Sequence, residues 1–256
     1  MSLLELREVS RSFGGVRALE AVSLGVDEGA IVGLIGPNGA GKTTLFNIVS
    51  GLLLADHGTV TLAGQEVGRL PAHRRAALGL GRSFQNLGLM MEETVEFNVL
   101  TALHRSARYT GFDVAVRPWL RRRGESVLRE RCERALRRFG LLADRDRQVR
   151  DLPFARARFV ELAAVTAEAP RLMLLDEPTT GLDLAEVSRL DAVLGQLRRD
   201  GTTILLVAHD VRFVMGVCDH VYVLAEGRML AQGPPRVVQA HPAVVEAYLG
   251  TPARAG

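Results

Sequence analysis

The feature that most constrains the fold is a glycine-rich segment placed between an apolar run and a helical pattern. Gly36-Pro-Asn-Gly-Ala-Gly-Lys-Thr43 follows the apolar run Ala30–Ile35 and precedes a helix that we expect from Lys42 to about Ser50. Apolar runs of this length are typical of strands buried on both faces of a mainly parallel sheet. Glycines allow backbone N–H groups to point inward around phosphate oxygens, and a helix N-terminus adds partial positive charge. The segment therefore predicts a phosphate-binding loop in an α/β fold.

Lys42 carries the positive charge of this loop. It is the only lysine among the 32 lysine and arginine residues of the chain. A compact ammonium fits between phosphates, where a guanidinium fork is too wide. We therefore expect Lys42 on the β- and γ-phosphates of ATP and the Thr43 hydroxyl on Mg²⁺, although a glycine-rich turn without a ligand is the alternative. The loop residues expected to contact ATP are Gly36, Pro37, Asn38, Gly39, Ala40, Gly41, Lys42, Thr43 and Thr44.

Two carboxylates follow a second buried strand. The run Arg171-Leu-Met-Leu-Leu-Asp-Glu-Pro178 places Asp176 and Glu177 at the carboxyl end of that strand, the edge at which α/β sheets bind ligands. We expect Asp176 to bind Mg²⁺, directly or through water, and Glu177 to polarise the attacking water as a general base. Taken alone, the pair is equally well explained as solvated acids. A neighbouring phosphate-binding loop favours the catalytic interpretation.

Three single residues gain meaning only from their surroundings. His209 directly follows the strand expected over Ile204–Ala208, so we expect it at the same sheet edge as the two carboxylates, within reach of a γ-phosphate. A lone histidine is otherwise usually structural. Gln85, in Arg82-Ser-Phe-Gln-Asn86, is by itself a surface amide, and Phe13 is by itself a core residue.

Composition excludes several other kinds of protein. Apolar residues make up 47% of the chain, enough for a sizeable core, but no run approaches the roughly 18 residues that span a bilayer. The N-terminus carries acids where a signal peptide has basic residues, so we expect a cytoplasmic protein. Cys132 and Cys218 have no metal-type spacing and are expected in the core. The basic cluster Arg117–Arg123 is interpreted as a solvated face or loop rather than as a surface for nucleic acid or lipid headgroups.

The order of the patterns indicates a parallel α/β core with an inserted helical lobe. The core is expected to comprise residues 1–91 and 167–256, and the lobe about 92–166, where helical spacing replaces strand-like runs. A hairpin at Glu226-Gly227 is expected to close the core. The remaining expected elements are strands over Leu4–Val9, Val22–Val26, a pair within 58–67 and Leu172–Leu175, and helices over Leu184–Arg199 and Arg158–Glu168.

Together these residues resemble the ATP-binding cassette (ABC) family over nearly the whole chain. The matching motifs are Walker A at Gly36–Thr44, Walker B at Leu172–Glu177, the D-loop at Gly181–Asp183, the Q-loop glutamine Gln85 and the switch histidine His209. The resemblance implies a P-loop NTPase (RecA-like) core with an antiparallel β portion and a helical lobe. It also implies that Gln85 takes part in catalysis and Mg²⁺ binding, and that Phe13 stacks on adenine.

A narrower resemblance concerns the transported solute. The segments Ser12–Leu19, Gly81–Gln85 and His241–Gly250, with the basic insert around 105–125, look like the ATPase subunits of branched-chain amino acid importers. This implies a peripheral subunit on the cytoplasmic face of the plasma membrane. Its partners would be a second ABC ATPase subunit, membrane permeases and, indirectly, a solute-binding protein, with no nucleic acid. Leu87–Met91 would then be a permease contact or ordinary core.

One motif departs from the family pattern. The signature, L-S-G-G-Q or close to it, aligns with Leu152, Pro153, Phe154, Ala155 and Arg156. Proline removes the serine hydroxyl and a backbone N–H, and a phenylalanine ring cannot reproduce the close approach of a glycine. In this family two cassettes enclose two ATP molecules, each held by one chain's Walker A and the other chain's signature. We therefore expect a heterodimer whose partner supplies an intact signature. The charge of Arg156 is expected to compensate in part for the contacts with the opposite γ-phosphate that the altered segment loses.

Other functions stay open at the level of sequence. The chain can be a weakly hydrolysing cassette that serves mainly as a dimer partner, or a soluble ABC ATPase without a transporter. The substitutions in the signature can also be tolerated without consequence, as in a working homodimer.

Overall fold

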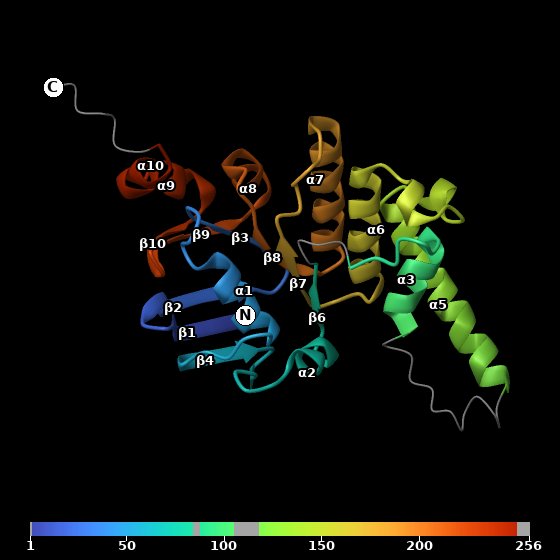
Figure 1. Ribbon diagram of the computed structural model, residues 1–256, viewed down its shortest axis with the longest axis horizontal. Helices are drawn as coiled ribbons and strands as arrows, with labels where there is room; N and C mark the ends of the chain where they lie inside the picture. Colours follow the sequence, from blue (N-terminus) through green and yellow to red (C-terminus); the bar gives the residue numbers. More distant parts are fainter. Residues whose placement is uncertain (1, 84–87, 105–117, 250–256) are drawn as a thin grey trace. The chain divides into compact units, whose positions relative to one another are not determined.

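The computed structural model describes residues 2–83, 88–104 and 118–249 (Figure 1). Gln85 and Arg117 lie outside the described residues, as do the side chains of the rest of the basic cluster. The chain divides into two compact units, each described here by itself. The core unit comprises residues 1–82, 171–180 and 187–256, and the helical unit comprises residues 83–170 and 181–186.

A six-stranded sheet forms the centre of the core unit, in the order β10-β9-β3-β8-β7-β6. Strands β3, β7 and β8 are buried at every residue, as their apolar runs predict. Strands β9, β3, β8, β7 and β6 pair in parallel, and β10 closes the edge as an antiparallel hairpin. The strand bounds are β3 Ile31–Ile35, β6 Leu80–Arg82, β7 Leu172–Asp176, β8 Thr203–Val207, β9 His220–Ala225 and β10 Arg228–Gly233.

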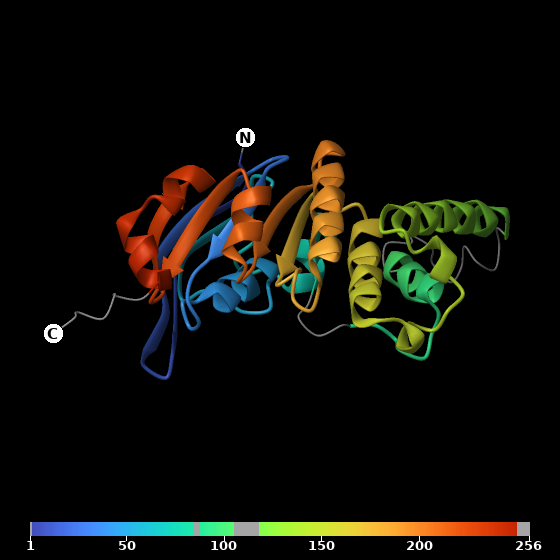
Figure 2. The ribbon, with the colours of Figure 1, turned by 90° about the horizontal axis from the view of Figure 1, so that it is seen from above.

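A second, antiparallel sheet belongs to the same unit and has the order β2-β1-β4-β5. Its strands are β1 Ser2–Phe13, β2 Val16–Asp27, β4 His57–Leu62 and β5 Gln65–Glu66. Helix α1, Lys42–Ser50, and this sheet lie on one side of the central sheet, with α7 and α8 on the other (Figure 1). The tip of the β1–β2 hairpin projects past the neighbouring strands (Figure 2).

Helices connect and cover the strands of the core unit. Helix α7 runs over Leu184–Arg199, the bounds that its amphipathic pattern predicts, and buries Leu190, Val193, Leu194 and Leu197. Asp210 caps α8, Val211–Val217, by accepting from two backbone N–H groups. The other helices are α2 Ala72–Ala77, α9 Pro235–Gln239 and α10 Pro242–Leu249; the last two pack beside β10 (Figure 2).

In the described part of the helical unit, three helices pack together: α3 Val95–His104, α5 Pro118–Arg138 and α6 Phe154–Ala167. In α5 the buried positions Leu128, Cys132 and Leu136 recur every four residues, which confirms the helical spacing. Short 3-10 turns at Leu142–Asp144 and Val149–Asp151 link α5 to α6. No helix in the described parts of the chain is both long and apolar enough to cross a bilayer.

The start of α6 corrects one prediction. The helix expected from Arg158 begins instead at Phe154, with Pro153 as its N-cap residue. Proline cannot donate a backbone hydrogen bond, so the position just before the first turn suits it. The last three residues of the segment Leu152–Arg156 therefore lie in the first turn of α6, and Leu152 and Pro153 directly precede the helix.

Candidate functional site

The glycine-rich loop joins β3 to α1 at the carboxyl edge of the central sheet. Its tight path depends on glycine, because a Cβ on Gly36 would collide with the carbonyl oxygen of Leu224. Gly41, the N-cap of α1, has φ +101°, and a Cβ there would lie 2.5 Å from the carbonyl oxygen of Ala18. No side chain caps α1, so the N–H groups of its first turn point outward, as an anion-binding loop requires.

Lys42 begins α1 and is buried, with 7% of its surface exposed. Its ammonium donates to the backbone carbonyls of Gly36 and Pro37 at 2.7 and 2.9 Å, so the loop closes around its own cation. Burial lowers the pKa of Lys42, and the carboxylates of Glu177 and Asp176 oppose that effect. A phosphate in the loop would offer this cation oxygen acceptors of full negative charge.

Asp176 and Glu177 lie where β7 ends, as predicted, and both are buried, at 5% and 4% exposure. Glu177 adopts φ +51°, a left-handed conformation uncommon for a side chain of this kind, and its N–H bonds the Val207 carbonyl at 2.9 Å. This hydrogen bond continues the pairing of β7 with β8 by one residue beyond the end of the strand. Burial raises the pKa of Glu177, an effect that His209 partly opposes. A carboxylate poised in this way is suited to accept a proton.

The structure brings His209 to Glu177. The imidazole Nε2 lies 3.2 Å from one carboxylate oxygen of Glu177, and the His209 backbone N–H donates to the other oxygen, also at 3.2 Å. The imidazole remains largely exposed, so it can contact a ligand while it touches the carboxylate. The loop, the two carboxylates and the histidine thus belong to the same unit and the same edge of the sheet.

The sequence interpretation did not include Arg82, which also contacts this site. At the end of β6, its guanidinium lies 3.5 Å from the Asp176 carboxylate and donates to Asn47 and Ser50 of α1. β6 pairs with β7 so that Arg82 is opposite Leu174, two residues before Asp176 and on the same face. The sequence offered no clear signal for Arg82, because β6 has only three residues.

These residues fit a nucleotide with its metal. A phosphate group fits the glycine loop, since side chains are excluded from it and a buried cation and uncapped helix N–H groups surround it. Among the described residues there is no cluster of three or more acidic, histidine or cysteine side chains that would hold a metal alone. Magnesium needs no such cluster when one carboxylate and a hydroxyl act together with phosphate oxygens. Asp176 and Thr43 are the residues that would hold it.

Phe13 lies at the exposed tip of the β1–β2 hairpin, where 45% of it is accessible. The Arg11 guanidinium sits 4.9 Å from the centre of its ring. An exposed ring in this setting is available for stacking, whereas the alternative of a core position for Phe13 is wrong.

The signature segment is engaged within the helical unit. Arg156 donates to the Asp144 carboxylate and to the Gly140 carbonyl, the latter at 3.0 Å. The Phe154 ring is half-exposed and covers Gly181, where a Cβ would lie 2.5 Å from the ring. The guanidinium charge therefore has a partner within the unit, which argues against the compensation expected of Arg156.

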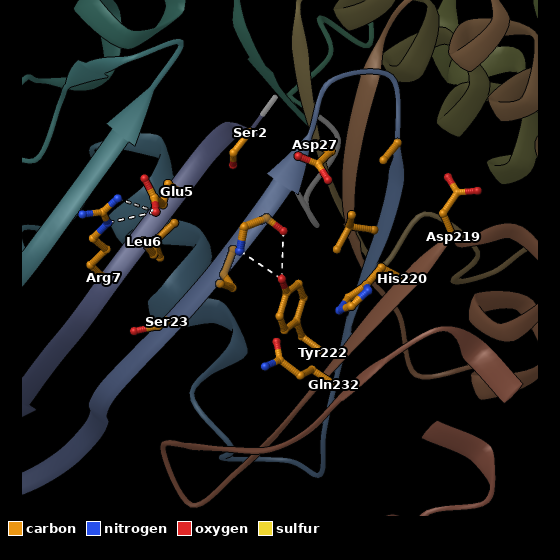
Figure 3. A pocket seen from close by; sticks show the side chains of 14 residues that line it. Ser2, Glu5, Leu6, Arg7, Ser23, Asp27, Asp219, His220, Tyr222 and Gln232 are labelled. Atoms are coloured by element: carbon orange, nitrogen blue, oxygen red, sulfur yellow. Dashed lines mark hydrogen bonds and ion pairs between the residues drawn. The ribbon is translucent and has the colours of Figure 1, made fainter. Parts of the chain in front are cut away.

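The core unit also contains a hollow of about 630 Å³ between β1, β2 and β9 (Figure 3). Its lining residues do not include Lys42, Asp176, Glu177 or His209. The Tyr222 hydroxyl in its floor accepts from the Gly25 N–H and donates to the Gly25 carbonyl. Asp219 accepts from a backbone N–H and pairs with Arg198, and Glu5 pairs with Arg7. The hydrogen bonds between Tyr222 of β9 and Gly25 of β2 join the two sheets of the unit, and the other polar groups pair within their own surroundings, so we assign the hollow a structural role.

Comparison with known proteins places the chain among transport ATPases. A family model described as "ABC transporter" matches residues 19–180. A second model, described as "Branched-chain amino acid ATP-binding cassette transporter", matches residues 228–254. The first covers the glycine loop and both carboxylates, and the second covers the last strand and the C-terminal helices.

Individual proteins are similar over nearly their full lengths. The high-affinity branched-chain amino acid transport ATP-binding protein LivG of Salmonella typhimurium is 39% identical over 97% of this chain and 98% of its own. The lipopolysaccharide export system ATP-binding protein LptB of Haemophilus influenzae is 33% identical over 98% of both chains. A crystal structure of a nucleotide-free ATP-binding cassette from an ABC transporter matches with a TM-score of 0.85 at 27% identity, covering 98% of this chain and 100% of that one.

Proposed function

The chain belongs to the ABC transporter family, and from this premise we propose that it is the ATP-hydrolysing subunit of a branched-chain amino acid importer. The proposal depends chiefly on one observation: the Lys42 loop, Glu177 and His209 lie together at the carboxyl edge of the central sheet. Lys42 and the N–H groups of the loop bind the β- and γ-phosphates. Glu177 takes the proton of the attacking water, and His209 contacts the γ-phosphate from the exposed side of Glu177.

Magnesium, when bound with ATP, neutralises phosphate charge as the terminal phosphoryl group is transferred to water. Asp176 and the Thr43 hydroxyl hold the metal, and Gln85, outside the described residues, completes its surroundings by family resemblance. Phe13 stacks on adenine from the hairpin tip. Each role is inferred from the motif that contains the residue. The burial of Lys42, Asp176 and Glu177 supports these roles.

The solute assignment rests on two comparisons. Identity is higher to the branched-chain amino acid protein than to the lipopolysaccharide export protein, 39% against 33%, and the C-terminal model carries the amino-acid description. The chain would bind integral-membrane permeases at the cytoplasmic face of the plasma membrane and act with a solute-binding protein through them. The exposed Met90 and Met91 of the helical unit offer a flexible apolar contact for a permease segment.

The function is tested with the assembled transporter in vesicles. ATP hydrolysis and uptake of labelled leucine should rise together when the binding protein is loaded, and Glu177→Gln should abolish both while ATP still binds. Hydrolysis coupled to another solute would refute the amino-acid assignment. Turnover that survives in Glu177→Gln would refute the proposed base.

A second cassette with an intact signature is part of this proposal. In the helical unit Arg156 is engaged by Asp144 and Gly140, and Phe154 covers Gly181, so this segment is poorly suited to bind another chain's γ-phosphate. One ATP site of the pair would then combine this chain's Walker A with the partner's signature, and the other site would be degenerate.

The dimer is tested by comparing the purified chain alone with the chain plus its partner cassette. Hydrolysis should be weak alone and rise with the partner, and Glu177→Gln in this chain should remove most of the gain. In a matched experiment, the corresponding glutamate change in the partner should matter less. A homodimer that hydrolyses ATP at ordinary importer rates would overturn the heterodimer.

A further inference from the structure

Arg82 joins two parts of the candidate site that are far apart in the sequence. Its Nη1 donates to the Ser50 hydroxyl at 2.6 Å, to the Asn47 side chain at 2.9 Å and to the Phe46 carbonyl at 3.3 Å. Its Nη2 lies 3.5 Å from Asp176 Oδ2. One guanidinium thus connects the last turns of α1 with the end of β7.

The lengths of these contacts show which partner fixes the guanidinium. The two short hydrogen bonds go to side chains of α1, and the Phe46 ring lies 5.9 Å from the guanidinium carbon, whereas the contact with Asp176 is the longest. Helix α1 therefore sets the position of Arg82, and Arg82 presents a fixed positive charge to Asp176. A planar fork can satisfy acceptors on both sides in this way, which a lysine cannot.

The pair is almost wholly removed from water. Both side chains are 8% exposed, so the attraction between them is screened much less than between surface charges. Asp176 is also adjacent to the buried carboxylate of Glu177, and Lys42 is within electrostatic reach of both. Arg82 therefore gives the Asp176 carboxylate a buried charged partner that helix α1 holds in a fixed place.

We propose that Arg82 is a positioning residue for magnesium: anchored on α1, it holds the Asp176 carboxylate in the orientation that the metal accompanying ATP requires. The inference rests on the proposed Mg·ATP site and adds a residue to it. Groups that support a metal ligand in this way typically change metal affinity by about 10–100-fold when they are removed.

The test measures how much magnesium improves nucleotide binding. The affinity of the purified chain for a fluorescent ATP analogue is measured with excess Mg²⁺ and with EDTA, and the ratio of the two affinities is the metal dependence. We expect Arg82→Met to lower this ratio about tenfold and to leave the affinity in EDTA unchanged. Arg82→Lys should lower it less, and the control Arg7→Met, at an exposed pair with Glu5, should leave it unaltered.

A double-mutant cycle separates positioning from general loss of structure. If Arg82 acts through Asp176, adding Arg82→Met to Asp176→Asn should not lower the metal dependence further. A full additional loss in that background, or an unchanged ratio in Arg82→Met itself, would overturn the proposal. Should Arg82→Met fail to fold, Ser50→Ala removes one anchor of the guanidinium, together with a local hydrogen bond to the Asn47 carbonyl. It should give a smaller fall in the ratio, and no fall would equally count against Arg82.

The same experiment distinguishes this inference from the function on which it rests. A wild-type chain that binds the nucleotide equally well with Mg²⁺ and EDTA would refute the proposed Mg·ATP site. A wild-type chain with clear metal dependence that Arg82→Met retains would refute the role of Arg82 alone.

Discussion

Replacing Arg75 tests how the helix that carries Lys42 is held. Arg75 lies in α2 and is 0% exposed, and its guanidinium donates to four backbone carbonyls at 2.5–3.1 Å. Two of these belong to Ile48 and Val49, in the last turn of α1, and the others to Leu70 and Gly68. Burial lowers the pKa of Arg75. The four backbone carbonyls offset this effect by accepting hydrogen bonds from the charged guanidinium.

The expected loss in Arg75→Met follows from those carbonyls. The Ile48 carbonyl keeps a hydrogen bond from the Gly51 N–H at 3.2 Å, so the loss falls mainly on the other three. Each buried acceptor left without its donor costs about 1 kcal/mol, at the low end of the usual range because methionine also relieves the burial of a charge. The free energy of unfolding should fall by about 3 kcal/mol, and the melting temperature by about 6–12 °C.

Calorimetry and urea unfolding of the purified chain measure this change, with Arg7→Met as a surface control. Because Arg7 is exposed and its ion pair with Glu5 lies at the surface, its replacement should leave the unfolding midpoint essentially unchanged. Saturating ATP should recover part of the stability of Arg75→Met, since ligand binding favours the folded state. A loss below about 1 kcal/mol would refute the view that these carbonyls depend on Arg75.

Three further predictions concern the site and its surroundings. Burial raises the pKa of Glu177 above its ordinary value of 4.5, so single-turnover hydrolysis should already fall above pH 4.5 as the pH is lowered. Because the same shift means that the fold disfavours the ionised carboxylate, Glu177→Gln should melt no lower than wild type at neutral pH. Asp144→Asn should release Arg156 and lower the unfolding free energy by about 2 kcal/mol, measured by urea unfolding; an unchanged midpoint would contradict it. Tyr222→Phe removes the hydroxyl that bonds both backbone groups of Gly25 and should destabilise the core unit by about 2 kcal/mol without changing ATP affinity, checked by calorimetry and nucleotide titration.

Elements with strong periodic patterns were predictable from the sequence. The buried strands β3, β7 and β8, the glycine loop and helices α1 and α7 are confirmed where the patterns placed them. The three strands are continuous apolar runs, the buried residues of α7 recur with helical spacing, and glycine and threonine mark the loop. The position of His209 directly after a buried strand also predicted its place at the sheet edge of Glu177, which lies 32 residues away in the chain.

Other elements were missed for physical reasons. Strand β6 has three residues, too few for an alternating pattern, and its end is a charged side chain. Helix α2 is short, and its one buried residue is Arg75, which a hydrophobic pattern assigns to the surface. The partners of Arg82 and Arg156 were beyond reach as well, because contacts between side chains 94 and 12 residues apart depend on how the elements pack.

The placement of the cations explains the unusual use of a single lysine. Arg75, Arg82 and Arg156 each serve several acceptors in different directions, which suits a planar group with five donors. Lys42 instead donates to two carbonyls of one tight loop, at the start of helix α1. Arginine therefore joins elements of the fold, while lysine is kept where phosphates are to bind. The same contrast supports the proposed heterodimer, in which Arg156, paired with Asp144, would substitute poorly for a signature residue.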